Sequence, residues 1–224
     1  MILDSFLIRD WVLELIIPIV TGVISIYLLY KYNHLKKQGA LFKRLKTLAI
    51  GFLLICIGFL FKSFLVFKLV TSGVLNFAII NKFFLGLSTL PNFKAILPFF
   101  LVLSGIFCLF SVSFKERNTL SLITLMGIII ISTGFFIDMS LMEFYVISST
   151  LLFIIGINEI IKDRNDESNS LVFGIFYISL GISFLSYLFI PESFDFYIIA
   201  KIARFFSAFL LGVLFTYLLL KRKK

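Results

Sequence analysis

The chain has 224 residues, of which 60% are hydrophobic and 15% are charged, and its formal net charge at pH 7 is +9. Soluble globular domains have about 25% charged residues, so this composition excludes an ordinary soluble enzyme. The basic residues lie in short segments between apolar runs, which favours anionic lipid headgroups over nucleic acid as their partner.

Seven apolar segments follow one another along the chain. Each has roughly the 20 residues that an α-helix needs to cross the hydrocarbon core of a bilayer. Lipid offers no hydrogen-bond partners to open backbone groups, so we expect each of them to be helical. They are residues 11–30, 47–70, 95–114, 119–137, 141–161, 171–190 and 196–220. The sequence therefore predicts an all-α polytopic membrane bundle, with residues 1–224 forming a single transmembrane domain.

The segment 74–90, with the sequence VLNFAIINKFFLGLSTL, is ambiguous because Asn76, Asn81 and Lys82 interrupt it. An eighth crossing would place both termini on one side of the membrane. The C-terminus is the basic sequence KRKK, whereas the N-terminal segment is net negative. We therefore expect an interfacial or re-entrant helix on the outer side. A marginal eighth span remains the alternative.

The charges separate by side when the N-terminus is placed outside. The inner side then holds 14 Lys/Arg and 5 Asp/Glu, whereas the outer side holds 7 of each, so the whole net charge of +9 lies inside. This asymmetry follows the positive-inside rule. It predicts an outer N-terminus and an inner C-terminus, and we expect the cytoplasmic membrane of a prokaryote. The inner loop 31–46, with six basic residues and no acid, is expected to bind anionic headgroups.

A pattern of two glycines seven residues apart occurs three times, each time in a span that enters from the inside. The shared order is Gly, three apolar residues, Ile, Cys or Ser, one residue, Gly. The pairs are Gly51 and Gly58, Gly127 and Gly134, and Gly174 and Gly181. Small residues with this spacing share one helix face and let helices approach closely. The pattern predicts one helix followed by three quasi-repeated hairpins, whose glycine faces pack within the bundle or against a second copy or a partner protein.

The residues available for metal or haem binding are few. His34 is the single histidine, and the two cysteines, Cys56 and Cys108, lie in different apolar segments. Such positions lack the spacing of a zinc site and cannot supply two histidines to a haem. We expect reduced cysteines that pack against neighbours, no metal, no cofactor and no enzymatic activity.

Charges inside the spans are costly and often mark functional sites. Lys62 and Arg204 each lie about eight residues from the outer end of a span, or roughly 12 Å below the outer interface. Lys201 lies one turn from Arg204 on the same helix face. These three cations form the candidate ligand-binding site. The possible counter-charges are Glu14, Asp138 and Glu143. Structural ion pairing, or snorkelling of the long side chains to the headgroups, is the alternative.

The sequence GINEIIKDRND near the inner end of the fifth span contains Asn158 and Glu159. Lys162 follows Glu159 by three residues, which is typical of a solvated helix end. A proton-coupled carboxylate is the alternative, although the sequence names no buried partner for it.

Three functions remain open at this stage. The first is a sensor-like or accessory, partner-binding membrane module without catalytic chemistry. The second is a transporter or channel for a small anionic solute that uses Lys62, Lys201 and Arg204. The third is an intramembrane enzyme acting on lipid, for which only scattered carboxylates such as Glu14 are present.

Overall fold

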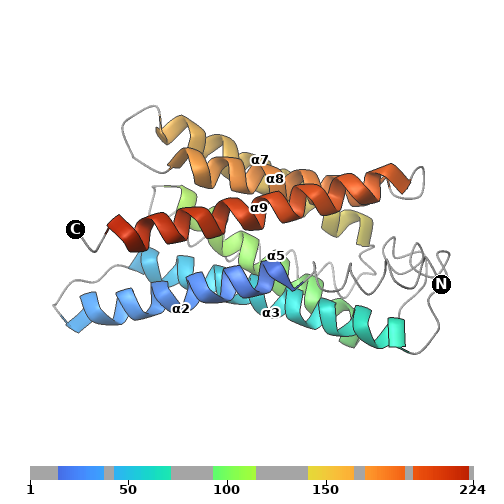
Figure 1. The fold of residues 1–224 in the computed structure, drawn as a ribbon, viewed down its shortest axis with the longest axis horizontal. Coiled ribbons are helices and arrows are strands. Elements are labelled where there is room, and N and C mark those ends of the chain that lie inside the picture. The colour runs from blue at the N-terminus through green and yellow to red at the C-terminus, as the bar shows by residue number, and fades with distance from the viewer. Residues whose placement is uncertain are drawn as a thin grey trace. The chain divides into compact units, whose positions relative to one another are not determined.

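The computed structural model describes residues 15–37, 43–71, 93–114, 141–163, 170–189 and 194–221 (Figure 1). The regular structure in these ranges is α-helical, without a strand, which confirms the predicted all-α class. The helices are α2 (Ile16–Lys37), α3 (Lys43–Thr71), α5 (Phe93–Ser113), α7 (Leu141–Asp163), α8 (Ser170–Tyr187) and α9 (Phe194–Lys221).

Four of these helices are long and apolar enough to cross a membrane. The candidate spans are Ile16–Lys36, Arg44–Phe64, Phe144–Ile161 and Asp195–Thr216, and two shorter apolar helices cover Leu97–Ser113 and Leu171–Tyr187. Length and apolar composition together indicate an integral membrane protein. The expected fourth span at 119–137 and the segment 74–90 lie outside the described residues, so the seven-span topology stays a prediction.

The chain divides into two compact units. Unit 1 comprises Met1–Val112 and Glu116–Phe144, and unit 2 comprises Ser113–Lys115 and Tyr145–Lys224. Among the described residues, unit 1 contains α2, α3 and all of α5 except its last residue. Unit 2 contains that residue, Ser113, together with α8, α9 and α7 from Tyr145 onward. Each unit is described by itself below.

In unit 1, helix α3 packs against α2 through small and polar residues. The hydroxyl of Ser25 in α2 donates a hydrogen bond of 2.8 Å to the carbonyl oxygen of Ala49 in α3. A Cβ atom added to Gly22 would lie 3.0 Å from the Sγ of Cys56. Both cysteines, Cys56 and Cys108, are free. The close approach of α2 and α3 therefore depends on small residues at this contact, where Gly22 faces the thiol of Cys56.

The opposite contact of α3 is an antiparallel crossing with α5 at two facing glycines. A Cβ atom on Gly105 would lie 2.7 Å from the carbonyl oxygen of Gly51 and 2.6 Å from Cγ1 of Ile55. A Cβ atom on Gly58 would lie 2.7 Å from the carbonyl oxygen of Pro98. These distances are below ordinary contact, so the two backbones touch where no side chain intervenes.

Unit 2 contains a crossing of the same kind between α7 and α8. A Cβ atom on Gly156 would lie 2.9 Å from the carbonyl oxygen of Gly174 and 2.6 Å from Cγ1 of Ile178. A Cβ atom on Gly174 would lie 2.5 Å from Cγ1 of Ile160. Gly181, seven residues after Gly174, faces α7 more loosely, with its nearest neighbour atom at 3.3 Å on Phe153. In both units, the isoleucine four residues after one of the facing glycines closes the contact.

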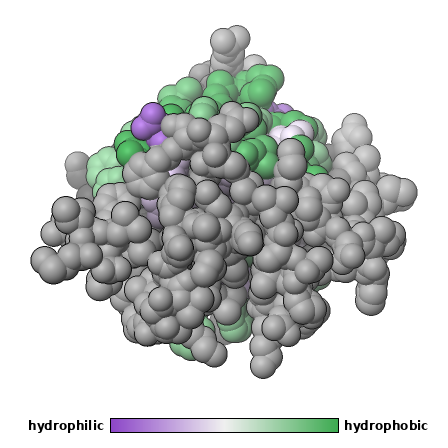
Figure 2. All heavy atoms as spheres, turned by 90° about the vertical axis from the view of Figure 1, so that its right-hand side faces the viewer, coloured by the Kyte–Doolittle hydropathy of each residue, from purple (hydrophilic) through white to green (hydrophobic). Residues whose placement is uncertain are grey.

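The interiors and the exteriors of the described helices are both apolar. The largest fully buried side chains are Tyr145, Tyr187, Phe52, Phe59, Ile55, Leu103, Ile106, Leu109, Leu152, Ile155 and Leu180. Large apolar side chains are also exposed, among them Ile26, Phe64, Ile157, Ile161, Ile202 and Phe209. Figure 2 shows that most described atoms on the visible face belong to hydrophobic residues. Such an exterior matches a lipid environment and not water.

Several boundaries differ from the expectation: α3 begins at Lys43 instead of residue 47, and α8 ends at Tyr187 instead of residue 190. Helix α2 continues to Lys37, whereas the sequence placed the end of the first span at residue 30 and a loop from residue 31. The extra residues, KYNHLKK, include Leu and Lys, which have high helix propensity. Hydrophobicity marks where the lipid ends, but the backbone hydrogen bonds continue into the basic segment.

Candidate functional site in unit 2

The deepest described cation of unit 2 is Arg204 in α9. It lies nine residues after Asp195 in the 22-residue candidate span Asp195–Thr216, close to the middle of that span. Its side chain is 3% exposed. A guanidinium stays charged at any physiological pH. A permanent charge is thus buried at a depth where charges are rare and usually functional.

Two residues of α8 position the guanidinium of Arg204. Its Nε donates to the hydroxyl of Ser183 at 3.3 Å, and its Cζ lies 4.8 Å from the ring centroid of Tyr187. Ser183 and Tyr187 are four residues apart, so they share one face of α8. The serine fixes one edge of the guanidinium, and the aromatic ring supports it by a cation–π contact.

Helix α7 adds a second tyrosine behind the first. The rings of Tyr145 and Tyr187 are stacked, with centroids 5.3 Å apart and an interplanar angle of 14°. Both rings are fully buried. We call Tyr145, Ser183, Tyr187 and Arg204 the Arg204 cluster. All three described helices of unit 2 contribute to it, so its geometry depends on the packing of that unit.

A buried serine lies one turn from Tyr145 on the same face of α7. Ser148 is fully buried, and its Oγ has no hydrogen-bond partner among the described residues. Buried polar groups in proteins are nearly always satisfied by protein, water or a bound group. This hydroxyl therefore marks a further polar position in the interior of unit 2.

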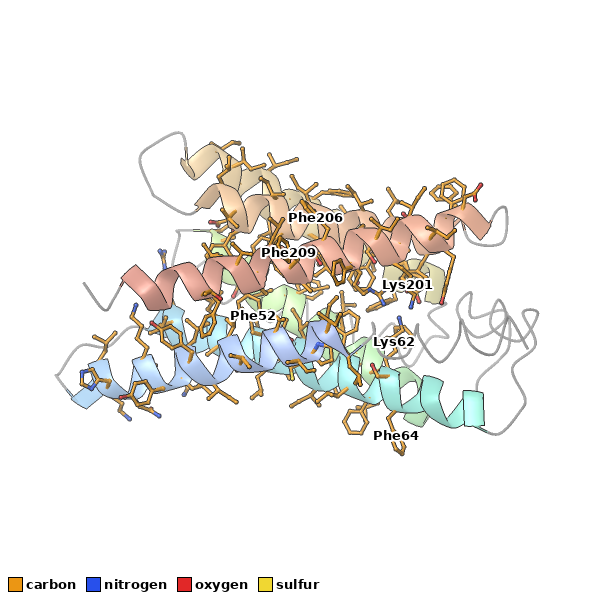
Figure 3. All side chains as sticks on the ribbon, viewed as in Figure 1. Phe52, Lys62, Phe64, Lys201, Phe206 and Phe209 are labelled. Carbon is orange, nitrogen blue, oxygen red and sulfur yellow. The ribbon has the colours of Figure 1, made fainter. Side chains whose placement is uncertain are left out.

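Lys201 lies one turn before Arg204 and is partly exposed. Its Nζ lies 5.1 Å from the ring centroid of Tyr197, one turn further back on the same helix. Lys201 and Arg204 both lie in α9, three residues apart. Figure 3 shows Lys201 projecting from the side of α9.

The third expected cation, Lys62, belongs to unit 1. It projects from α3 (Figure 3), is 3% exposed, and its Nζ lies 6.0 Å from the ring centroid of Phe59. The side chain is thus buried, and the choice between a ligand site and structural ion pairing or snorkelling stays open. Lys62 and the pair Lys201 and Arg204 lie in separate units, so the single pocket of three cations stays a prediction.

Other expected residues lie outside the described ones. The proposed counter-charges Glu14 and Asp138 and the repeat glycines Gly127 and Gly134 fall outside the described ranges. Glu143 is part of α7, but its side chain is outside the described ones. Their roles remain predictions.

A polar cluster that the sequence did not connect joins Ser113 to two residues of α7, all of them in unit 2. Asn158 of α7 donates through Nδ2 to the carbonyl oxygen of Ser113 at 2.9 Å and to its Oγ at 2.8 Å. The Ser113 hydroxyl in turn donates to Oε1 of Glu159 at 2.8 Å. Ser113 is the last residue of α5, whose terminal carbonyl groups have no partner within the helix. Asn158 therefore caps the carbonyl group of Ser113, and Glu159 accepts a hydrogen bond from the Ser113 hydroxyl.

This cap differs from the expected solvated helix end. The sequence offered no partner for Glu159 because Ser113 lies 46 residues earlier in the chain. A weak signal was present, since a serine at the end of an apolar segment and an asparagine inside another both require hydrogen bonds in lipid.

The described residues contain no group of three or more His, Cys, Asp or Glu side chains that could hold a metal ion. The arrangement in unit 2 offers hydroxyl groups and one fixed guanidinium, which suit recognition of an anion. Comparison with known proteins adds no family: no protein-family model, no curated protein and no solved structure matches this chain.

Proposed function

We propose that the chain is a sensor-like membrane module without catalytic activity, and that unit 2 binds an anionic ligand at the Arg204 cluster. The observation that supports this most strongly is the burial of Arg204 near the middle of a candidate span, with Ser183 and Tyr187 holding its guanidinium. Ionisable residues at such depth are functional candidates by default.

The chemistry of arginine supports an anion as the ligand. A guanidinium presents five N–H donors in one plane, a geometry that matches the two oxygens of a carboxylate. Ser183 engages the Nε donor, and Tyr187 lies against the group. A guanidinium oriented in advance loses little conformational entropy when a ligand binds.

The non-catalytic part of the proposal rests on the sequence. A single histidine and two cysteines in separate helices offer no nucleophile beside a base, and no phosphate-binding glycine loop precedes a helix. An accessory role beside another membrane protein agrees with the same observations, and a partner that remains bound through purification would support it.

Ligand binding can be tested by thermal stabilisation of the purified protein in phosphatidylcholine nanodiscs. A ligand present at about 100 times its Kd stabilises the folded state by about 2.7 kcal/mol. We expect carboxylates to raise the melting temperature of the wild type and to raise that of Arg204→Lys much less. Arg44→Gln removes an exposed cation of α3 and serves as the control. Equal stabilisation of all three proteins, or of none, would disprove the proposal.

A transporter or channel for anions is the second candidate, and the buried Lys62 in α3 favours it as a further cation within a span. Reconstituted vesicles loaded with chloride or a carboxylate distinguish the two. A transporter should show flux above that of empty vesicles, and Lys62→Gln and Arg204→Lys should each reduce it. A sensor-like module should bind without flux.

A further inference from the structure

We infer that the hairpin of α2 and α3 binds one anionic diacyl phospholipid of the predicted inner leaflet, with the lipid phosphate beside Lys46 and Tyr30. The site lies in unit 1, so this inference goes beyond the proposed function of unit 2 and does not depend on it. Three features support it: an exposed stripe on each helix, the common side of the two stripes, and the polar residues that end them.

Helix α2 has one continuous exposed stripe. Its members recur every three or four residues, so they lie above one another on one helix face. The stripe comprises the exposed apolar side chains of Ile19, Val23 and Ile26, then Tyr30, which is 63% exposed, and finally the exposed Asn33. Toward the C-terminal end of α2, the stripe therefore changes from apolar to aromatic and then to polar.

Helix α3 has a matching stripe that runs toward its N-terminal end. Lys46 is exposed and lies two residues after the start of the candidate span Arg44–Phe64. Apolar residues with helical spacing follow it on the same face. Figure 3 shows the last of them, Phe64, on the opposite side of α3 from the buried Lys62. They are Leu53 and Ile57, which are half-buried, and Leu60 and Phe64, which are exposed.

The two stripes lie on the same side of the hairpin. The helices meet where Ser25 bonds to Ala49 and where Gly22 faces Cys56, so they run antiparallel. At about 100° per residue, the stripe of α2 lies about 90° from the midpoint of its two contact residues, and the stripe of α3 lies about 60° from the midpoint of its own. Both rotations have the same sense along the chain. In an antiparallel pair, this brings both stripes to one side.

The polar ends of the stripes lie at a similar height in the hairpin. Tyr30 lies five residues after Ser25, and Lys46 lies three residues before Ala49, which corresponds to about 7.5 Å and about 4.5 Å along the helix axes from the bond between Ser25 and Ala49. Packed helices have axes about 8–10 Å apart, and a lysine side chain extends toward headgroups. The Lys46 ammonium and the Tyr30 hydroxyl can therefore engage the same phosphate.

The charge at this end of the hairpin favours an anionic lipid over a zwitterionic one. The segment 31–46 contains six basic residues and no acid. A choline headgroup would bring a further cation beside these bases, whereas a glycerol headgroup would not. Tyrosine is enriched at the level of the headgroups, and its hydroxyl can donate to a phosphate oxygen. The apolar parts of the stripes offer a surface to the acyl chains, which a soluble phosphate would leave unused.

The test is native mass spectrometry of the full chain in detergent that contains equal amounts of phosphatidylglycerol and phosphatidylcholine. We expect the wild type to retain one phosphatidylglycerol in preference to phosphatidylcholine. Lys46→Gln should weaken this binding about fivefold, the effect of one lysine near an anionic surface. Lys46→Arg should bind as the wild type does. Tyr30→Phe should weaken binding about threefold through the loss of one hydrogen bond.

Lys31→Gln is the matched control because it removes the same charge as Lys46→Gln. Lys31 is exposed and follows Tyr30 in the chain, so it lies about 100° around α2 from that residue and outside the stripe. We expect it to bind phosphatidylglycerol nearly as the wild type does. Equal losses in Lys31→Gln and Lys46→Gln would overturn the inference, since the overall charge and not this site would then attract the lipid.

Soluble glycerol phosphate separates a bound lipid from a bound phosphate. We expect that it does not displace phosphatidylglycerol even in large excess, because it lacks the acyl chains. Displacement by glycerol phosphate, or equal retention of phosphatidylcholine and phosphatidylglycerol by the wild type, would overturn the inference. None of these measurements involves Arg204, so a failure here would leave the proposed function of unit 2 standing.

Discussion

At the scale of single residues, the polar side chains of unit 2 pair across helices. Asn158 and Glu159 both bond to Ser113, and Ser183 holds the guanidinium of Arg204. Groups of this kind cost several kcal/mol when left without a partner in an apolar medium. Each pairing therefore stabilises the packing of unit 2 as well as satisfying its own atoms.

The cap at Ser113 gives the first prediction. Asn158→Leu preserves the approximate volume but removes both hydrogen bonds to Ser113, and we expect it to lower the free energy of unfolding by about 1–2 kcal/mol. Thr150→Ala, an exposed change on the same helix, should cost less than about 0.5 kcal/mol. Unfolding of the protein in mixed micelles by added dodecyl sulfate measures both. Equal losses would show that the cap does not stabilise the fold.

At the scale of elements, the described part of each unit contains a crossing in which glycines let two backbones meet. Gly51 faces Gly105 in unit 1, and Gly174 faces Gly156 in unit 2. The two crossings use different neighbours along the chain, since α3 meets the next described helix and α8 meets the described helix before it. The expected series of equivalent hairpins stays a prediction. If it is correct, equivalent glycines of the repeats pack against different neighbouring helices.

The crossings predict a strong dependence on the absence of a side chain. In Gly105→Ala and Gly156→Ala the new Cβ would lie within 3 Å of a backbone carbonyl oxygen, and overpacking of this kind costs about 1–3 kcal/mol. We therefore expect both variants to melt at lower temperature. Gly212→Ala is the matched control because a Cβ there meets nothing within 4 Å. It should be neutral or gain up to about 1 kcal/mol from helix propensity.

If Gly212→Ala destabilises the protein as much as the other two, the close crossings are not the cause. Melting curves followed by circular dichroism in one detergent are sufficient for this comparison.

The hydrogen bond between α2 and α3 gives a further prediction at this scale. Ser25→Ala removes the donor to Ala49, and interhelical hydrogen bonds in membranes are worth about 0.6 kcal/mol on average and at most about 1.7. Thr216→Ala removes an exposed hydroxyl that bonds only to Gly212 of its own helix and should change stability by a few tenths of a kcal/mol. A larger effect at Thr216 than at Ser25 would contradict the assignment. Dodecyl sulfate titration measures this difference as well.

At the scale of the whole molecule, the charges of the chain predict its orientation. The basic end of α2 is expected inside, and the start of α9 is expected outside. Lys36 and Asp195 are both exposed on described helices, so a cysteine at either position would be accessible to a reagent in water. Cysteines at these two positions therefore report on the two sides of the membrane through the same labelling reaction.

In a background with Cys56→Ser and Cys108→Ser, an impermeant maleimide added to intact cells should label Asp195→Cys. It should label Lys36→Cys only after the cells are permeabilised. The reverse pattern would invert the topology, and labelling of both positions in intact cells would show that the end of α2 and the start of α9 do not lie on opposite sides.

The helices of this protein were largely predictable from the sequence. The expected segment 141–161 corresponds to α7 (Leu141–Asp163), and the segment 95–114 corresponds to α5 (Phe93–Ser113). Such agreement follows from local physics, because a run of apolar residues long enough to span lipid must satisfy its own backbone as a helix. The end of α2 was missed since hydrophobicity reports the edge of the lipid and not the end of the hydrogen-bonded backbone.

The sequence by itself determined that this is an all-α membrane protein, with a predicted orientation and few charges deep in its spans. The length, composition and charge of a segment can be read from residues that are adjacent in the chain. Only the tertiary structure decided which glycine meets which, that Asn158 caps Ser113, and that Ser183 and Tyr187 hold Arg204. These contacts depend on the rotation and register of helices that are distant in sequence. In an apolar chain many rotations bury similar area, so close packing and the satisfaction of a few polar groups select among them.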